Sequence, residues 1–247
     1  MIVLGIDTAT SVSSVALAGR EGVIGSRVLA QGRGHVEFLM PAIVDLARET
    51  GVALEHLAGV AVDVGPGLFT GMRVGIATAK TIAQNLTVPL VGIPSLDLLA
   101  FGVRYSHKLI CPVIDAKRAE VFTAFYRAVP GGVERESDYT SMTPQDLAAE
   151  ILARREHVLL VGDGAPAYRD AFAPLDDVEI ATRQYPSAEV LVELAIPKLE
   201  REEFSSPERL EPLYVRRSDA EIKWDRRGVV IERPNRIQIP KRSREAG

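Results

Sequence analysis

The sequence predicts an α/β protein made of two similar lobes, each with the element order βββαβα. In each half of the chain an apolar run ends in an aspartate, at Asp7 and at Asp115. Later in each half a valine-rich run ends in a glycine turn, at residues 64–67 and at residues 161–164. A repeat of this length indicates two lobes of one kind, because solenoid repeats are much shorter.

The individual elements follow from hydrophobic periodicity, since alternation predicts strands and apolar residues three and four apart predict helices. The elements expected in the first half are strands at 2–8, 13–17 and 23–29, a helix at 35–50, a strand at 60–64, a helix from about 71 to 85, a strand at 88–93 and a helix at 96–101. Those expected in the second half are strands at 109–115, 121–126 and 133–139, a helix at 146–154, a strand at 157–161 and a helix at 165–172.

A last helix is expected at 187–203, followed by a polar, proline-containing and finally basic stretch. We therefore divide the chain into four segments. They are a first lobe at 1–103, a second, smaller lobe at 104–186, a helix and extension at 187–217 that packs back on the first lobe, and an extended or disordered tail at 218–247.

Composition narrows the class of protein. The 247 residues suffice for one large or two small domains, and a net charge of -4 argues against a wholly basic nucleic-acid-binding surface. Cys111 is the single cysteine, which predicts neither a disulfide framework nor a cysteine-rich metal site. No apolar run reaches membrane-spanning length and the first residues carry no targeting signal, so we expect a cytoplasmic protein.

The stretch over residues 59–85 predicts a strand, a glycine turn and a helix without a gap. Gly65 and Gly67 form the turn, and Thr70 is expected to cap a helix that begins near Gly71. Free amides at such a helix start can hold an anion, so a phosphate site is one interpretation. The alternative is a turn that only packs helix on strand, because the P-loop and dinucleotide spacings are absent.

Small residues recur every four positions along this helix, at Gly71, Gly75, Ala79 and Ala83. Residues at this spacing share one face of a helix, and another backbone can approach such a face closely. That backbone could belong to a partner helix or to the protein's own sheet. Both interpretations stay open from the sequence.

A duplicated βββαβα lobe with an aspartate after its first strand resembles the actin-like superfamily, also called the ASKHA or RNase H-like fold. Three motifs narrow the resemblance: Ile6-Asp-Thr-Ala-Thr10, Gly65-Pro-Gly-Leu-Phe-Thr-Gly-Met-Arg-Val-Gly75 and Glu211-Pro-Leu-Tyr-Val-Arg216. Together they resemble the TsaB (YeaZ) family from Met1 to about Arg217, and the middle motif is specific.

The resemblance implies a role in making threonylcarbamoyladenosine on tRNA. It implies a heterodimer with a TsaD-like transferase, cooperation with a TsaE-like ATPase, and contact with tRNA through the complex, with a homodimer as an alternative. No tightly bound cofactor is implied, and ATP is expected only in the assembled complex.

In the related transferase, a His-x-x-x-His pair supplies two metal ligands. This chain has His35-Val-Glu-Phe-Leu39 there, and Leu39 cannot bind a metal. We therefore expect no metal site and no catalytic residue, which favours a scaffold subunit, or pseudo-enzyme. The alternative is an ATP-binding or carbamoyl-transferring enzyme in its own right.

The scaffold interpretation predicts an interface on the helices at 35–50 and 71–85. The residues expected there are His35, Leu39, Met40, Ile43, Gly71, Met72, Gly75, Ile76, Ala79 and Ala83. The weaker nucleotide-binding candidates are Asp7, Thr8, Gly65, Gly67 and Asp115. For Asp7, the alternative is a structural role in which its carboxylate bonds the amides of the following turn.

Overall fold

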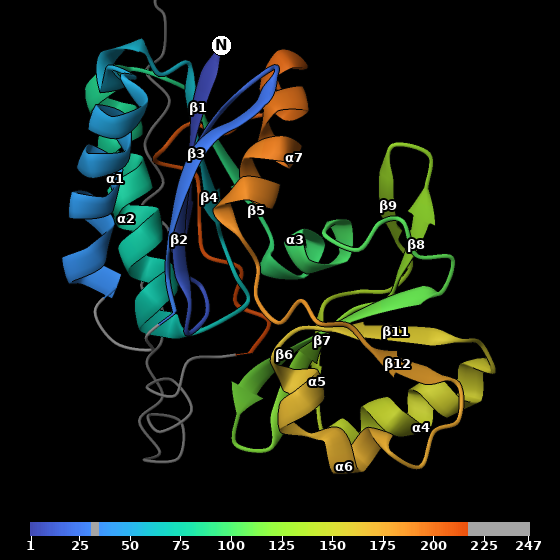
Figure 1. The fold of residues 1–247 in the computed structure, drawn as a ribbon. Coiled ribbons are helices and arrows are strands. Elements are labelled where there is room, and N and C mark those ends of the chain that lie inside the picture. Colours follow the sequence, from blue (N-terminus) through green and yellow to red (C-terminus); the bar gives the residue numbers. More distant parts are fainter. Residues whose placement is uncertain (31–34, 217–247) are drawn as a thin grey trace, which may run out of the picture. The chain divides into compact units, whose positions relative to one another are not determined.

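A computed structural model describes residues 1–30 and 35–216, and the tail expected at 218–247 lies outside the described residues. The described chain is a mixed α/β structure with two sheets, which confirms the α/β class (Figure 1). None of its helices is both long and apolar enough to span a membrane.

The first sheet has the strand order β3-β2-β1-β4-β5. Its strands are β1 (Ile2–Asp7), β2 (Ser13–Gly19), β3 (Gly22–Leu29), β4 (Gly59–Asp63) and β5 (Leu90–Ile93). The first three strands pair antiparallel, whereas β4 is parallel to both β1 and β5. The carboxyl ends of β1, β4 and β5 therefore lie at one edge, where Asp7 and Asp63 end their strands.

Helices cover both faces of this sheet (Figure 1). On one face lie α1 (His35–Thr50) and α2 (Phe69–Leu86), and a short 3-10 helix, Leu54–His56, precedes β4. On the other face lies α7 (Ala188–Glu200). Gly5 lets α7 approach β1, because a Cβ there would lie 2.6 Å from Val192 Cγ1 and 2.9 Å from the Ala188 carbonyl oxygen.

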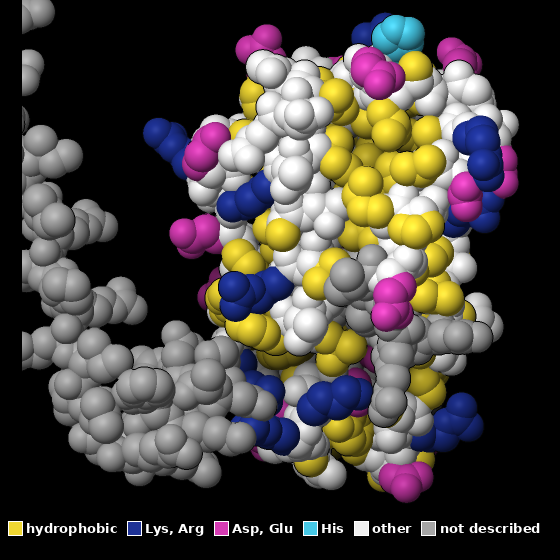
Figure 2. Space-filling view, turned by 90° about the vertical axis from the view of Figure 1, so that its left-hand side faces the viewer, with side chains coloured by type: hydrophobic (Ala, Val, Ile, Leu, Met, Phe, Trp, Pro, Cys, Tyr) yellow, Lys and Arg dark blue, Asp and Glu magenta, His cyan; other side chains and the backbone are white. Residues whose placement is uncertain are grey.

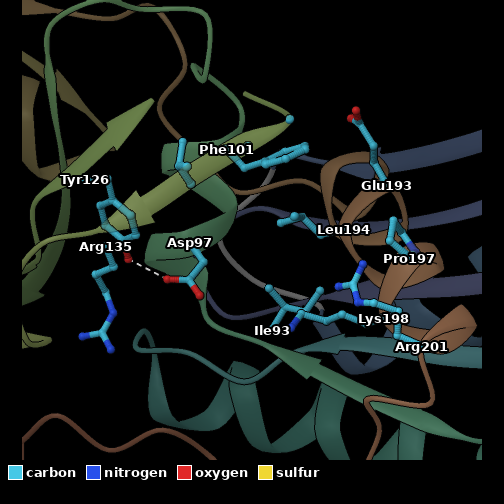
Figure 3. Close-up of a pocket in the computed structure, with 13 residues that line it drawn as sticks. Ile93, Asp97, Phe101, Tyr126, Arg135, Glu193, Leu194, Pro197, Lys198 and Arg201 are labelled. Atoms are coloured by element: carbon cyan, nitrogen blue, oxygen red, sulfur yellow. Dashed lines mark hydrogen bonds between the residues drawn. The ribbon is translucent and has the colours of Figure 1, made fainter. Parts of the chain in front are cut away.

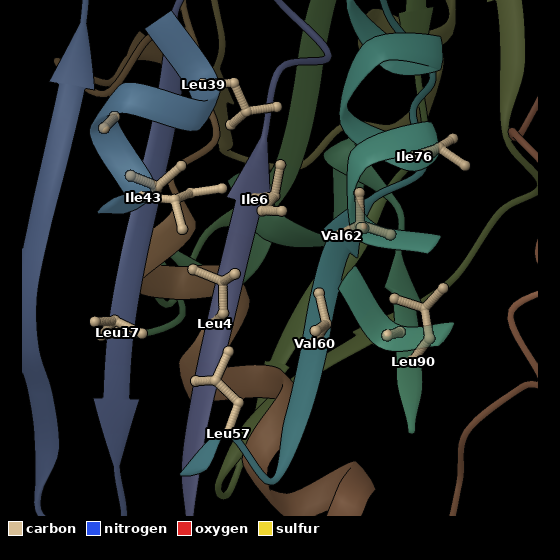
Figure 4. Close-up of a cluster of buried hydrophobic side chains, with 14 of the residues drawn as sticks. Leu4, Ile6, Leu17, Leu39, Ile43, Leu57, Val60, Val62, Ile76 and Leu90 are labelled. Atoms are coloured by element: carbon tan, nitrogen blue, oxygen red, sulfur yellow. The ribbon is translucent and has the colours of Figure 1, made fainter. Parts of the chain in front are cut away.

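The largest core lies between the sheet and the two helices α1 and α2 (Figure 4). Leu4 and Ile6 of β1 point toward Leu39 and Ile43 of α1, and all four side chains are buried. Burying one such side chain contributes about 1.5–3 kcal/mol to folding. This core fixes which side of α1 faces inward.

The second sheet has the main order β10-β7-β6-β11-β12, and a hairpin of β8 and β9 adds to β6. Its elements are β6 (Leu109–Lys117), β7 (Glu120–Thr123), β8 (Tyr126–Val129), β9 (Gly132–Arg135), β10 (Thr140–Met142), α4 (Pro144–Arg154), β11 (Val158–Val161), α5 (Gly164–Ala167), α6 (Arg169–Phe172) and β12 (Val178–Ile180). The order of strands repeats that of the first sheet, with two antiparallel strands beside the first and two parallel ones beyond it.

Two strands expected in this half are wrong in extent. The run at 121–126 is divided between β7, which pairs with β10, and β8, which pairs with β9. The division falls at Phe125, whose amide donates to Ser137 Oγ at 2.9 Å and whose ring is buried in the core. The run at 133–139 is likewise divided into the end of β9 and the approach to β10.

The helix α3 (Ser95–Phe101) joins the two sheets, since it follows β5 but packs in the core of the second sheet. Leu96, Leu99 and Ala100 are fully buried there, together with Ile110 and Tyr126. This shared core holds α3 against the strands β6 and β8.

Candidate functional site

The turn after β1 and the glycine turn before α2 pack directly on each other. Thr8 Oγ1 donates to the Gly71 carbonyl oxygen at 2.8 Å, and the Leu68 amide donates to the Ala9 carbonyl oxygen at 2.6 Å. A Cβ at Gly67 would lie only 2.0 Å from that same Ala9 oxygen. The two turns therefore approach each other so closely that only a glycine fits at position 67.

Of the nucleotide-binding candidates, Thr8 and Gly67 lie in these two packed turns. Nucleotide binding by Thr8, Gly65 and Gly67 stays a prediction. The helix begins earlier than expected, at Phe69, with Leu68 before it and no side-chain cap. Thr70 therefore lies inside the helix and is not its cap.

Two buried carboxyl groups, Asp7 and Asp63, lie below these turns at the ends of β1 and β4. Asp7 Oδ1 accepts from the Ala9 amide at 3.1 Å, which is the structural alternative for this residue. Asp63 Oδ1 accepts from the Gly65 amide at 2.7 Å and from Ser95 Oγ at 2.6 Å. The Oδ2 atom of each acid is buried and accepts no bond from another described residue.

The two acids satisfy each other when Asp63 is protonated, because its O–H group can then donate a hydrogen bond to the Asp7 carboxylate. Burial raises the pKa of Asp7 to about 6, although bonds from Ala9 and Asp63 oppose this rise. Burial and the charge of Asp7 raise the pKa of Asp63 well above its usual range. The pair is thus a structural carboxyl–carboxylate contact closed to solvent.

This pair contributes a part of the folding stability that falls as the pH rises. The folded state keeps protons that the unfolded chain releases at ordinary pKa values, so unfolding is favoured from the usual Asp7 value of 3.8 up to about 6. Asp63 extends the fall to higher pH. Each retained proton lowers the free energy of unfolding by at most about 1.4 kcal/mol for each unit by which the pH rises. Urea unfolding at several pH values between about 4 and about 8 measures this slope.

Asp63→Asn tests the origin of this slope. The amide can accept the bonds from Gly65 and Ser95 and donate to Asp7 without titrating. We expect a shallower slope and, near pH 8, stability at least equal to that of the wild type. Asp45→Asn is the control, because that carboxylate pairs with Arg48 on the surface. A wild-type slope in the Asp63 variant would contradict the assignment.

Asp115, the other candidate for nucleotide binding, belongs to a separate cluster in the second sheet. Its carboxylate accepts from the Lys117 amide at 2.8 Å, from Lys117 Nζ at 2.6 Å and from the Tyr168 hydroxyl at 3.0 Å. Burial acts to raise the pKa of Asp115, but the bonds from Lys117 outweigh it and hold the pKa below its usual value. Among the described residues, no hydrogen bond joins it to the turn after β1.

The stripe of small residues on α2 packs on the protein's own sheet. A Cβ at Gly75 would lie 2.3 Å from Thr8 Oγ1, and Ala79 and Ala83 are buried in the core with β1 and β4. The expectation that the stripe contacts a partner is therefore wrong for the isolated chain. Together with the stripe, most of the other interface candidates are buried in the chain itself. The buried candidates are Leu39, Ile43, Gly71, Met72, Gly75, Ile76, Ala79 and Ala83.

The outer side of the same two helices presents apolar side chains to solvent. Met40 and Val44, one turn apart on α1, are 47% and 51% exposed, and Phe69 at the start of α2 is 43% exposed. Figure 2 looks onto this side and shows hydrophobic side chains gathered along it. We call Met40, Val44 and Phe69 the helix face. Of the expected interface residues, Met40 lies on it, and the side chain of His35 is outside the described part.

Sequence reasoning missed several residues of this region. Phe69 and Tyr214 come from two of the quoted motifs, and their rings stack with centroids 5.7 Å apart. Arg73 lies over the Phe69 ring at 5.2 Å. Asp63 was also missed, although a single acid inside a buried valine run was a signal that it must be paired or protonated.

Comparisons with known proteins match the chain to the TsaD family model and to TsaB proteins. The family model described as "TsaD: tRNA N6-adenosine threonylcarbamoyltransferase" matches residues 22–224. The chain is 28% identical to the tRNA threonylcarbamoyladenosine biosynthesis protein TsaB of Bacillus subtilis, covering 91% of this chain and 98% of that protein. It is 27% identical to the TsaB of Escherichia coli, covering 89% and 96%.

Solved structures give the same result. The structure described as YeaZ from Pseudomonas aeruginosa matches with a TM-score of 0.73 and 26% identity, covering 86% of this chain and all of that one. A second structure from the same organism, described as similar to peptidase YeaZ, matches with a TM-score of 0.78 and 28% identity, covering 87% and 99%.

Proposed function

Because the chain belongs to the TsaB (YeaZ) family, which the TsaD family model also matches, we propose that it is a scaffold subunit for threonylcarbamoyladenosine modification of tRNA. In this role it binds a TsaD-like transferase in the cytoplasm and supports ATP use by a TsaE-like ATPase. It contacts tRNA through the complex.

The observation that carries this proposal is the helix face. Large apolar side chains exposed one turn apart leave part of α1 without a partner in the isolated chain. Aromatic residues and methionine are enriched at protein interfaces, and Phe69 and Met40 are of these types. The stacked Tyr214 extends the exposed apolar surface beyond the start of α2.

Two features support a non-catalytic role. The glycine turn before α2 and the turn after β1 pack directly on each other through backbone atoms, which disfavours a nucleotide between them. Leu39, at the second position of the transferase's histidine pair, points into the core and is buried. ATP is therefore expected to bind in the assembled complex and not in this chain's own glycine turns.

The double variant Met40→Glu and Val44→Glu tests the proposal. Two carboxylates on the helix face must be desolvated on docking, and a hot-spot residue typically contributes about 2 kcal/mol or more. We expect the affinity for the cognate transferase to fall about thirtyfold or more, with the melting temperature little changed. TsaE-dependent ATP hydrolysis by the reconstituted complex should fall in parallel.

Leu152→Glu is the matched control, because this leucine of α4 is 67% exposed on the second lobe. It should leave transferase binding at the wild-type level. Wild-type affinity in the helix-face variant would remove this face from the interface. The alternative is that the helix face forms a homodimer. Light scattering on the isolated wild type and on the double variant tests it, because the variant would then dissociate the dimer.

A further inference from the structure

A cavity of about 380 Å³ lies where α3, α7 and the β8–β9 hairpin meet (Figure 3). It lies on the α7 side of the first sheet, whereas the helix face belongs to α1 and α2. Its volume falls in the range of small-molecule sites, about 300–1,000 Å³. Nothing in the proposed scaffold role uses it.

Apolar groups form most of the cavity wall. Phe101, Ile93 and the ring of Tyr126 are buried, and Leu194 and Val133 are partly exposed along it. Figure 3 shows Phe101, Leu194 and Ile93 around one space. Such a wall suits a flat or branched hydrocarbon body.

Asp97 supplies a hydrogen-bond acceptor at one side of this space. Its Oδ1 atom accepts from the Tyr126 hydroxyl at 2.6 Å and from the Tyr139 hydroxyl at 2.8 Å. Neither bond uses Oδ2, and the residue is only half-buried. The two tyrosines therefore hold the carboxylate in place and leave one oxygen for a donor. Arg135 lines the same side, but its guanidinium lies over the Tyr139 ring at 4.1 Å and donates to the Ser137 carbonyl oxygen at 2.8 Å.

Positive charge predominates among the groups of the opposite rim. Lys198 and Arg201 line the cavity, and both pair with the carboxylate of Glu203. Lys198 Nζ lies 3.5 Å from Glu203 Oε2, and Arg201 Nε lies 2.6 Å from Glu203 Oε1. Glu193, the acid on this part of the rim, is paired with Arg104 at 2.6 Å. This arrangement leaves about one cationic charge in excess on the α7 side.

We propose that this cavity binds a small aromatic carboxylate that carries one N–H donor. The ring packs against Phe101 and Leu194, the N–H donates to Asp97 Oδ2, and the carboxylate pairs with Lys198 and Arg201. The apolar wall, the acceptor and the cations then each meet a complementary group.

Indole-3-acetate is a suitable probe, because it has a flat ring, one N–H and one carboxylate. Calorimetric titration of the full chain should give saturable 1:1 binding with a Kd of about 1 mM or tighter, as expected for a ligand of this size. Its 1-methyl derivative lacks the donor and should bind about tenfold more weakly. Indole-3-acetamide lacks the charge and should bind more weakly by a similar factor.

Gly132→Leu places a side chain in the cavity, and its Cβ alone would make an ordinary contact, 3.8 Å from Phe101 Cε2. It should abolish saturable binding. Gly19→Leu is the matched control at the end of β2, where a Cβ would lie 3.4 Å from the nearest atom. Lys198→Gln with Arg201→Gln should weaken indole-3-acetate but leave the affinity for indole-3-acetamide unchanged.

Two results would overturn the proposal: absence of saturable binding by the wild type, or equal binding by the wild type and a folded Gly132→Leu. If Gly132→Leu does not fold, the wild type alone decides. Equal affinity of the wild type for indole-3-acetate and for its 1-methyl derivative would then contradict the proposal. The Met40→Glu and Val44→Glu variant should bind the probe with wild-type affinity. The cavity proposal and the transferase-docking proposal can therefore be contradicted separately.

Discussion

Gly75→Leu is expected to destabilise the isolated chain by about 3 kcal/mol or more. The first added carbon would lie 2.3 Å from Thr8 Oγ1, inside contact distance, and the rest of the side chain would separate α2 from β1. The bond from Thr8 Oγ1 to the Gly71 carbonyl would also break. Urea unfolding and the melting temperature measure the loss.

Ala77→Leu is the control on the same helix, because Ala77 faces solvent. Its stability should stay within about 0.5 kcal/mol of the wild type. If Gly75→Leu melted normally and lost only transferase binding, the stripe would face a partner, and its packing against Thr8 and the core would be contradicted.

The stripe shows why the sequence could predict the helix but not its environment. Small residues at every fourth position show that another backbone can approach one face of the helix closely. They do not show whether that backbone belongs to the protein's own sheet or to a second molecule. The identity of the neighbour depends on Thr8, which lies far from Gly75 in the sequence. The order of strands and helices along each half could be predicted, because it follows from local periodicity and the internal repeat. The pairing of strands could not, since the run at 121–126 is divided between β7 and β8.

For the nucleotide candidates the sequence leaves a similar question open. Asp7, Gly65 and Gly67 are the residue types that a phosphate site uses, and the sequence correctly indicated tight turns at the ends of buried strands. Whether two such turns leave a space between them depends on a distance of a few ångströms. Here the Ala9 carbonyl occupies the place where a side chain at Gly67 would lie.

Ile43→Glu is expected to unfold the chain, in contrast to Val44→Glu. Ile43 is 1% exposed in the core between α1 and β1, and the described residues around it are apolar. A carboxylate there loses its hydration and gains no hydrogen-bond partner, which costs several kcal/mol and makes loss of more than about 4 kcal/mol the expected result.

The comparison of these adjacent positions separates folding from docking. Val44 lies on the outer side of α1, so Val44→Glu should melt near the wild-type temperature while weakening transferase binding. Ile43→Glu should lose its cooperative melting transition, and any loss of binding would follow from unfolding. A folded Ile43→Glu with selective loss of binding would mean that the inner side of α1 is exposed in solution. Circular dichroism and binding measured on both variants therefore decide which side of this helix meets the partner.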